Sequence, residues 1–312
     1  MTVPGRLEAA PEDEFAPTVH TATTRVDGIP FSARVCAAPS PRAVLLALHG
    51  GGTTSVYFDC PGRPELSLLR TGAALGYTVI ALDRPGYGAS APHGDDFHDP
   101  ARRVDITYAA LDRLLTRLPC GQGVFLAAHS AGCELAVRMA ADPRGRQLLG
   151  LEIAGAGLRH DPDTVHALEA AEAIRRAGRR PTSMRETLWG PAALYAEDVW
   201  NTPHIASDSP LYESAARAWI EHDFAALAAR VRIPVEFSLG DHEKVWESGP
   251  AALAEITGLF TASPWVRANE QGGAGHNLSL GLAARAYHLR VLSFAEECAV
   301  LRTRGSAKGG NV

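Results

Sequence analysis

One serine in this sequence has the neighbours that a nucleophile needs. Ser130 lies in the pentapeptide 128–132 (Ala-His-Ser-Ala-Gly), directly after the apolar run 124–128 and before a segment with helical periodicity. A serine between a buried strand and a helix occupies a very sharp turn, which holds its hydroxyl above the edge of the sheet. The small residues Ala128 and Gly132 let strand and helix approach closely, and the helix N-terminus favours nearby negative charge. The pattern therefore predicts a nucleophilic serine.

A serine hydroxyl is a weak nucleophile on its own, so Ser130 needs a base. Of the 12 histidines in the chain, His276 fits this role best. It follows the last predicted strand in the glycine-rich loop 272–275 and precedes the last predicted helix, and such a loop lets the imidazole reach back to the serine. His129 adjoins Ser130, but its side chain must point elsewhere in so sharp a turn, and we expect it to be structural.

Short apolar runs alternate with helical patterns along most of the chain. Runs rich in β-branched residues predict strands at 18–26, 30–37, 43–48, 77–82, 124–128, 148–154, 233–239 and 265–268. The first two should form a hairpin that turns at Asp27-Gly28. The alternation that follows predicts an α/β protein with a mostly parallel, eight-stranded sheet flanked by helices on both faces.

One stretch interrupts the alternation, because no clear strand occurs between residues 156 and 230. We expect 156–230 to be a helical cap, inserted between the two parts of an α/β core at 18–155 and 231–302. The first 17 residues resemble a loose tail. Residues 303–312 are small, polar and rich in glycine, so we expect them to be disordered.

The composition sets limits on the partners of the protein. The 312 residues include 46% hydrophobic and 21% charged residues, as in a globular protein, and the net charge of −5 argues against a nucleic-acid partner. No run of 18 apolar residues and no signal peptide is present, so we expect a cytoplasmic protein with no membrane partner. The five cysteines are scattered and without metal-like spacing, which predicts reduced thiols. We expect no metal and no cofactor. The oligomeric state is not indicated.

Three further segments stand in a familiar order around the serine. They are 48–52 (Leu-His-Gly-Gly-Gly), 83–90 (Asp-Arg-Pro-Gly-Tyr-Gly-Ala-Ser) and 273–276 (Gly-Ala-Gly-His). Together with the pentapeptide, they resemble the α/β-hydrolase superfamily, in its branch with a lid after the sixth strand. The resemblance covers roughly residues 44–300 and departs from the family at Ala128, where glycine is usual. It implies an α/β-hydrolase sheet and a serine hydrolase with a helical cap.

The resemblance also implies an acid partner for His276 in the loop after strand 233–239. The family pattern, Gly-x-x-Asp with an apolar residue two positions later, assigns this role to Glu243. Asp241 remains the alternative acid, and Glu152, inside the preceding strand, is a more distant one. The acid fixes the tautomer of the histidine and stabilises the imidazolium without taking its proton.

An oxyanion hole needs two backbone N–H groups aimed at the developing negative oxygen. The N–H of Ala131, next after the nucleophile, should supply one. Gly51 should supply the other, with Gly52 as the alternative, because glycines let the backbone approach a substrate closely.

These residues predict a reaction that proceeds through an acyl-enzyme. We expect a serine hydrolase that cleaves an ester, a thioester or a related acyl bond of a small, hydrophobic substrate. One alternative is an acyltransferase or cyclase of secondary metabolism, which would use the same residues with another acceptor. A second is a non-catalytic binding protein, since a fold alone never proves activity.

Overall fold

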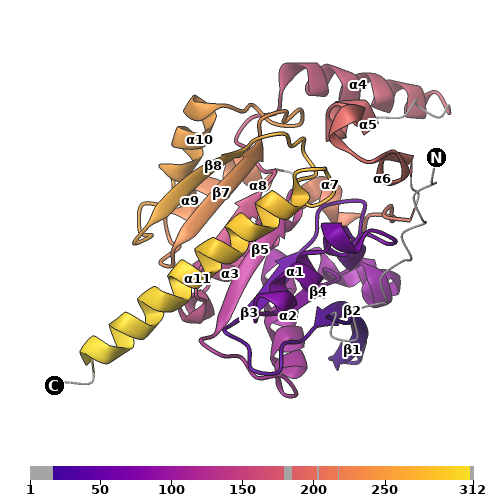
Figure 1. The fold of residues 1–312 in the computed structure, drawn as a ribbon. Coiled ribbons are helices and arrows are strands. Elements are labelled where there is room, and N and C mark those ends of the chain that lie inside the picture. Colours follow the sequence, from indigo (N-terminus) through magenta and orange to yellow (C-terminus); the bar gives the residue numbers. More distant parts are fainter. Residues whose placement is uncertain (1–16, 179–184, 202–203, 217, 310–312) are drawn as a thin grey trace, which may run out of the picture.

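The structure, a computed structural model, describes residues 17–178, 185–201, 204–216 and 218–309. At its centre lies one sheet of eight strands in the order β1-β2-β4-β3-β5-β6-β7-β8 (Figure 1). The pairs β1–β2 and β2–β4 are antiparallel, and every later pair in that order is parallel. The strands are β1 His20–Val26, β2 Ile29–Cys36, β3 Val44–Leu48, β4 Thr78–Leu82, β5 Val124–His129, β6 Leu151–Ala154, β7 Val235–Gly240 and β8 Val266–Gln271. The predicted α/β class and mostly parallel eight-stranded sheet are confirmed.

Helices cover both faces of the sheet because its central strands are apolar on both sides. Along β3, Val44, Leu46 and Leu48 belong to one hydrophobic core, whereas Leu45 and Ala47 belong to the other. Helices α2, α3, α9 and α10 pack into the first core, and α1 and α11 into the second. The helices are α1 Leu68–Ala74, α2 Pro100–Leu115, α3 Gly132–Ala141, α4 Pro162–Arg176, α5 Arg185–Trp189, α6 Glu197–Asn201, α7 Tyr212–Ala216, α8 Trp219–His222, α9 Phe224–Ala228, α10 Pro250–Thr257 and α11 Ala284–Gly309.

Residues 156–230, hereafter the β6–β7 segment, connect the sixth strand to the seventh. Their described part contains the helices α4 to α9 and no strand. Figure 1 shows α4, α5 and α6 gathered beyond one end of the sheet. The helix α9 at the end of the segment returns to the core and packs against α3. The segment therefore has the position in the chain that was expected for an inserted cap.

The end of the chain differs from the expectation. Residues 303–309, which we expected to be disordered, belong to helix α11. A helix that is already nucleated gains one hydrogen bond for each added residue, so a long packed helix continues through small polar residues. Arg302 also ties this end to the body, because it donates to the carbonyl oxygen of Leu148 (3.1 Å). The expectation of disorder was wrong for 303–309. Residues 310–312, and the predicted tail 1–17 up to residue 16, lie outside the described residues.

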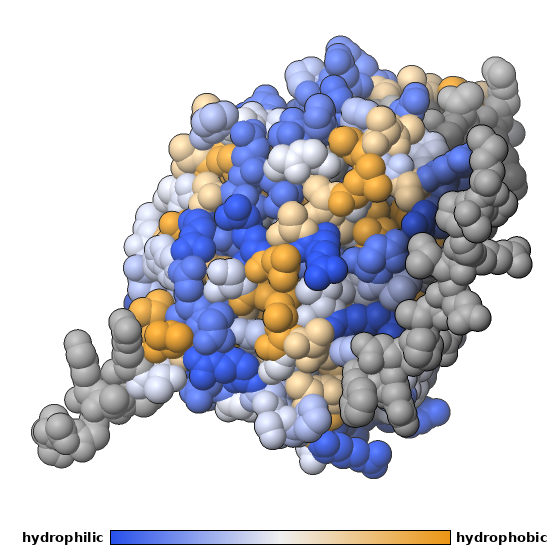
Figure 2. All heavy atoms as spheres, in the orientation of Figure 1, coloured by the Kyte–Doolittle hydropathy of each residue, from blue (hydrophilic) through white to orange (hydrophobic). Residues whose placement is uncertain are grey.

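The outer surface shown in Figure 2 has hydrophobic side chains in small groups between hydrophilic ones. The large hydrophobic side chains that are exposed include Leu75, Leu211, Leu282, Leu289 and Leu301. Scattered exposed leucines of this kind are normal for a globular protein.

Two glutamates lie side by side inside the sheet. Glu152 of β6 and Glu236 of β7 are paired in register, and both are buried. Glu152 Oε1 accepts a hydrogen bond from Tyr287 Oη (3.2 Å), and Glu236 Oε1 lies 3.7 Å from Arg267 Nη1. Burial, together with the charge of Glu236, raises the pKa of Glu152 well above its usual value. Burial also raises the pKa of Glu236 to about 7, although Arg267 and Arg290 oppose this rise.

We expect Glu236→Gln to stabilise the protein more at pH 8 than at pH 5. A carboxyl group whose pKa is raised by folding contributes its full stability below the unfolded pKa of 4.5 and loses it as the pH rises toward about 7. The amide does not titrate, so it removes a loss of about 2–3 kcal/mol in unfolding free energy. Urea unfolding at both pH values measures the difference, with the exposed Glu270→Gln of β8 as the control. Equal pH dependence in the wild type and Glu236→Gln would contradict this prediction.

Candidate active site

Ser130 occupies a strained turn between β5 and α3. Its φ of 51° lies in the left-handed region, which few residues other than glycine adopt. The Ser130 N–H donates to the carbonyl oxygen of Ala154 (2.8 Å), which helps to hold this conformation. Only glycine fits at position 132, where the helix approaches the strand closely, because a Cβ there would lie 2.5 Å from the carbonyl oxygen of His49. The sharp turn expected from the pentapeptide is therefore present, and it presents the hydroxyl to a cavity.

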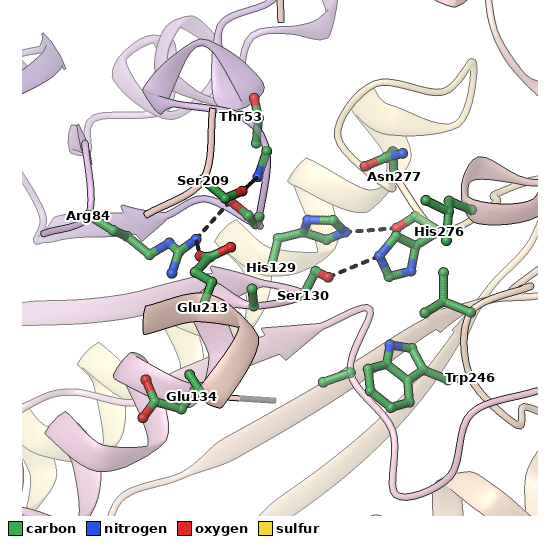
Figure 3. A pocket seen from close by; sticks show the side chains of 18 of the residues that line it. Thr53, Arg84, His129, Ser130, Glu134, Ser209, Glu213, Trp246, His276 and Asn277 are labelled. Atoms are coloured by element: carbon green, nitrogen blue, oxygen red, sulfur yellow. Dashed lines mark hydrogen bonds and ion pairs between the residues drawn. The ribbon is translucent and has the colours of Figure 1, made fainter. Parts of the chain in front are cut away.

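The loop after β8 brings His276 to this hydroxyl. His276 Nε2 lies 3.0 Å from Ser130 Oγ, at hydrogen-bonding distance (Figure 3). The main chain of His276 is fixed on two sides, since its N–H donates to the carbonyl oxygen of Trp189 (3.1 Å) and its own carbonyl oxygen contacts His129 Nε2 (2.8 Å). Contacts of the main chain thus position His276, and these contacts do not depend on the imidazole ring.

The other ring nitrogen of His276 faces Glu243. Nδ1 lies 3.0 Å from each carboxylate oxygen, and the Glu243 side chain is fully buried. Glu243 Oε1 also accepts hydrogen bonds from the N–H groups of Lys244 (2.9 Å) and Val245 (2.7 Å). Because a carboxylate can only accept, Nδ1 carries the hydrogen, and Nε2 presents its lone pair to the serine hydroxyl.

Asp241, the alternative acid, is used differently. Its carboxylate accepts hydrogen bonds from the N–H groups of Gly273 (2.9 Å) and Ala274 (3.0 Å). Partial burial raises the pKa of Asp241, but these backbone hydrogen bonds outweigh burial, and the pKa is lowered overall. Asp241 therefore braces the loop that carries His276. Glu152, the third candidate, accepts from Tyr287 inside the sheet.

The two N–H groups expected to bind an oxyanion lie beside the serine. A Cβ built on Gly51 would be 3.6 Å from Cβ of Ala131, so the two residues are neighbours across the cavity. Among the described residues, neither N–H has an acceptor. The N–H of Gly52, the alternative, is already engaged, because it donates to Ser209 Oγ (3.0 Å) and to Tyr87 Oη (3.3 Å).

His129 links the turn of the nucleophile to the loop of the base. Burial lowers its pKa well below the usual value, so the ring is neutral. Its Nε2 lies 2.8 Å from the carbonyl oxygen of His276 and must carry the hydrogen, since a carbonyl can only accept. The ring also stacks on Tyr57, with centroids 4.4 Å apart. The structural role expected for His129 is thus visible in these contacts, although its partners could not be read from the sequence.

Ser130 opens into a cavity of about 530 Å³ with two unlike sides. The apolar side includes Trp189, Trp219 and Trp246, of which the first two come from the β6–β7 segment. The charged side contains Arg84, from the loop after β4, and Glu213, from α7. Arg84 lies in the motif 83–90, which signalled a loop at this edge, whereas no sequence pattern indicated Glu213.

Charged groups at this site are paired. Arg84 Nη2 donates to the carbonyl oxygen of Gly50 (2.9 Å) and forms an ion pair with Glu213. Glu134, four residues after the serine, contacts Arg103 Nη2 (2.8 Å) and Arg138 Nε. A buried charge without a partner is costly, so these pairs explain how the cavity wall accommodates the three charged side chains of Arg84, Glu134 and Glu213.

Within the described ranges, no group of three or more histidine, cysteine or acidic side chains is arranged to hold a metal ion. In the same part of the chain, no helix is both long enough and apolar enough to cross a membrane. All five cysteines are free thiols.

Comparisons with known proteins identify the family and the fold. The model of the alpha/beta hydrolase family matches residues 44–299. Protein ABHD14A of Danio rerio is 34% identical over 91 residues, which are 29% of this chain and 32% of that protein, so the match spans about a third of its length. A thermostable carboxyl esterase from Bacillus coagulans superposes with a TM-score of 0.65 and 17% identity, covering 90% of this chain and 99% of the esterase. The thioesterase domain from the curacin biosynthetic pathway superposes with a TM-score of 0.58 and 18% identity, covering 88% of this chain and 99% of that domain. At sequence identities this low, the similarity to the two solved structures shows a shared fold.

Proposed function

The chain belongs to the alpha/beta hydrolase family, and from this premise we propose that it hydrolyses an ester or thioester of a small substrate through an acyl-enzyme on Ser130. The observation that carries the proposal is the continuous contact from serine to histidine to carboxylate. His276 Nε2 lies 3.0 Å from Ser130 Oγ, and its Nδ1 lies 3.0 Å from both oxygens of Glu243. This arrangement makes the serine a nucleophile at neutral pH.

The reaction follows from these contacts in two halves. Ser130 Oγ attacks the acyl carbon while His276 Nε2 takes the hydroxyl proton, and Glu243 stabilises the imidazolium that forms. The negative carbonyl oxygen of the intermediate binds the N–H groups of Gly51 and Ala131. The alcohol or thiol then leaves with the proton from His276. In the second half, a water molecule gives its proton to His276 and attacks the acyl carbon. The bond to Ser130 Oγ then breaks, His276 returns the proton to this oxygen, and the acid and the free enzyme are released.

The β6–β7 segment acts in this proposal as a cap over the reacting groups. The cavity is lined by Leu188 and Trp189 of α5, by Trp219 and Ile220 of α8, and by Trp246 of the core. An apolar, aromatic wall favours a hydrophobic part in the substrate, because burying apolar surface is favourable there. Residues 18–155 and 231–302 then form the catalytic core, which carries all of the proposed reacting groups.

The experiment that tests the function is labelling by a fluorophosphonate, which reacts with activated serines. We expect the wild type to be labelled at Ser130 and Ser130→Ala to be unlabelled. Ser214→Ala, which removes an exposed hydroxyl from the β6–β7 segment, is the matched control and should be labelled like the wild type. Turnover of a nitrophenyl ester and of an acyl thioester should follow the same order. An unlabelled wild type, or equal labelling of Ser130→Ala, would refute the proposal.

A further inference from the structure

The charged side of the cavity contains a carboxylate that the proposed reaction does not use. Glu213 of α7 lies between Arg84 and Ser130 (Figure 3). Its side chain is only 11% exposed, and Arg84, with 2%, is almost completely buried. A carboxylate this close to the reacting serine needs a chemical reason.

Arg84 fixes one oxygen of this carboxylate in place. Its Nη2 is shared between Glu213 Oε1 and the carbonyl oxygen of Gly50. This nitrogen is therefore engaged by the protein, and the Arg84 side chain is only 2% exposed. An anionic substrate that approached Nη2 would have to displace Glu213, so the pair does not favour anions.

The second oxygen, Oε2, lies against the backbone that is proposed to bind the oxyanion. A Cβ built on Gly51 would be 2.8 Å from Glu213 Oε2. The hydroxyl of Tyr87 lies 3.1 Å from Ser209 Oγ and also interacts with Glu213, so its single proton can satisfy at most one of the acceptors there. Oε2 is thus an acceptor in the cavity wall, beside the position of the reacting carbonyl.

We propose, on the basis of the hydrolytic function above, that the substrate carries a hydrogen-bond donor, a hydroxyl or an ammonium, next to its reacting carbonyl, and that Glu213 Oε2 binds it. A purely apolar substrate would exclude water from Oε2 without replacing the lost hydrogen bonds, which is unfavourable for a carboxylate. A site built around a buried polar group discriminates strongly against analogues that lack the matching group. The remaining part of the substrate packs against the tryptophans of the apolar side.

Binding and turnover of three matched esters test this inference separately from the function. Methyl octanoate, methyl 2-hydroxyoctanoate and methyl 2-aminooctanoate are titrated into Ser130→Ala protein, which cannot form an acyl-enzyme, and calorimetry gives their affinities. We expect at least one of the two donor-bearing esters to bind about tenfold or more tightly than methyl octanoate. The preferred ester identifies the donor as hydroxyl or ammonium. Equal affinities for all three esters would overturn the inference.

Variants of Glu213 show whether the preference originates there. In Glu213→Gln the side-chain oxygen must face Arg84, so the NH₂ group takes the place of Oε2. A hydroxyl can still accept from this NH₂, whereas an ammonium cannot, so only a preference for the amino ester should disappear. Glu213→Met should abolish both preferences, and Glu221→Gln, an exposed change on α8, should abolish neither. Thermal unfolding checks that each variant is folded. A preference that survives in folded Glu213→Met would overturn the inference.

Turnover by the wild type separates the two proposals. Hydrolysis of all three esters with equal kcat/KM, together with labelling of Ser130, would support the hydrolase and overturn the role of Glu213. Selective binding to Ser130→Ala protein without hydrolysis by the wild type would support the role of Glu213 and overturn the hydrolase.

Discussion

His276→Ala is expected to lower kcat for ester hydrolysis by about 10⁴- to 10⁶-fold, close to the effect of Ser130→Ala. Without the imidazole, Ser130 Oγ has no acceptor for its proton, and the leaving group has no donor. The N–H groups of Gly51 and Ala131 remain, so a small residual rate over the uncatalysed reaction should persist. Burst and steady-state kinetics with a nitrophenyl ester measure the change.

The double variant gives a sharper form of this prediction. If serine and histidine act as one unit, Ser130→Ala/His276→Ala should be no slower than either single variant, because each single change already removes the shared step. If the two side chains contributed independently, the rate losses of the two single variants would instead multiply in the double variant. A multiplicative loss, or a His276→Ala variant with activity near that of the wild type, would show that the 3.0 Å contact does not transfer a proton.

The fold of His276→Ala should be preserved, which makes the kinetic result interpretable. The loop is held by contacts of the main chain and of Asp241. The His276 N–H donates to Trp189 and its carbonyl oxygen contacts His129, while Asp241 accepts from Gly273 and Ala274. None of these contacts involves the imidazole of residue 276. Matching melting temperatures for the variant and the wild type are therefore expected.

Much of the sheet and of the site could be predicted because the governing interactions are local. The run 124–128 and the small residues around Ser130 determine a strand, a sharp turn and a helix within a few positions. The glycine-rich loop 272–275 likewise indicates a flexible return for His276. In both cases the residue types act on their own backbone, so neighbouring positions in the sequence carry the information.

Other features depend on contacts between distant segments, and these could not be predicted. Glu213 approaches Gly51 because α7 folds back over the loop after β3, a contact that no pattern along the chain expresses. The helix at 303–309 was missed because local composition favours disorder, whereas the packed body of α11 favours continuation. Tertiary context outweighs weak local propensity at both places.

Asp241 and Glu243 show the same contrast, between what the local sequence determines and what tertiary contacts determine, within three residues. The sequence places two carboxyl groups in the loop after β7, and either could have faced His276. The choice depends on the turn of the backbone, which directs Asp241 to the N–H groups of the histidine loop and Glu243 to the imidazole. A comparison of the two amide variants therefore tests the acid directly.

Glu243→Gln is expected to lower kcat by about 10³- to 10⁴-fold, whereas Asp241→Asn should lower it by less than about tenfold. The N–H groups of Lys244 and Val245 need an acceptor at the position of Oε1, so the amide oxygen of the glutamine must stay there. Its NH₂ group then takes the position of Oε2, 3.0 Å from His276 Nδ1, where it competes with the amide oxygen for this nitrogen and favours the tautomer with the hydrogen on Nε2. That tautomer cannot take the serine proton.

Asp241→Asn keeps one acceptor for the histidine loop and loses the other, at an exposed position where water can replace it. Its effect should therefore appear in the melting temperature at least as much as in kcat. The paired design separates an acid that orients the imidazole from one that braces the loop. If Asp241→Asn were the slower enzyme, the aspartate would be the acting acid. Equal losses in both variants would mean that the order of the loop, rather than the tautomer of His276, limits the rate.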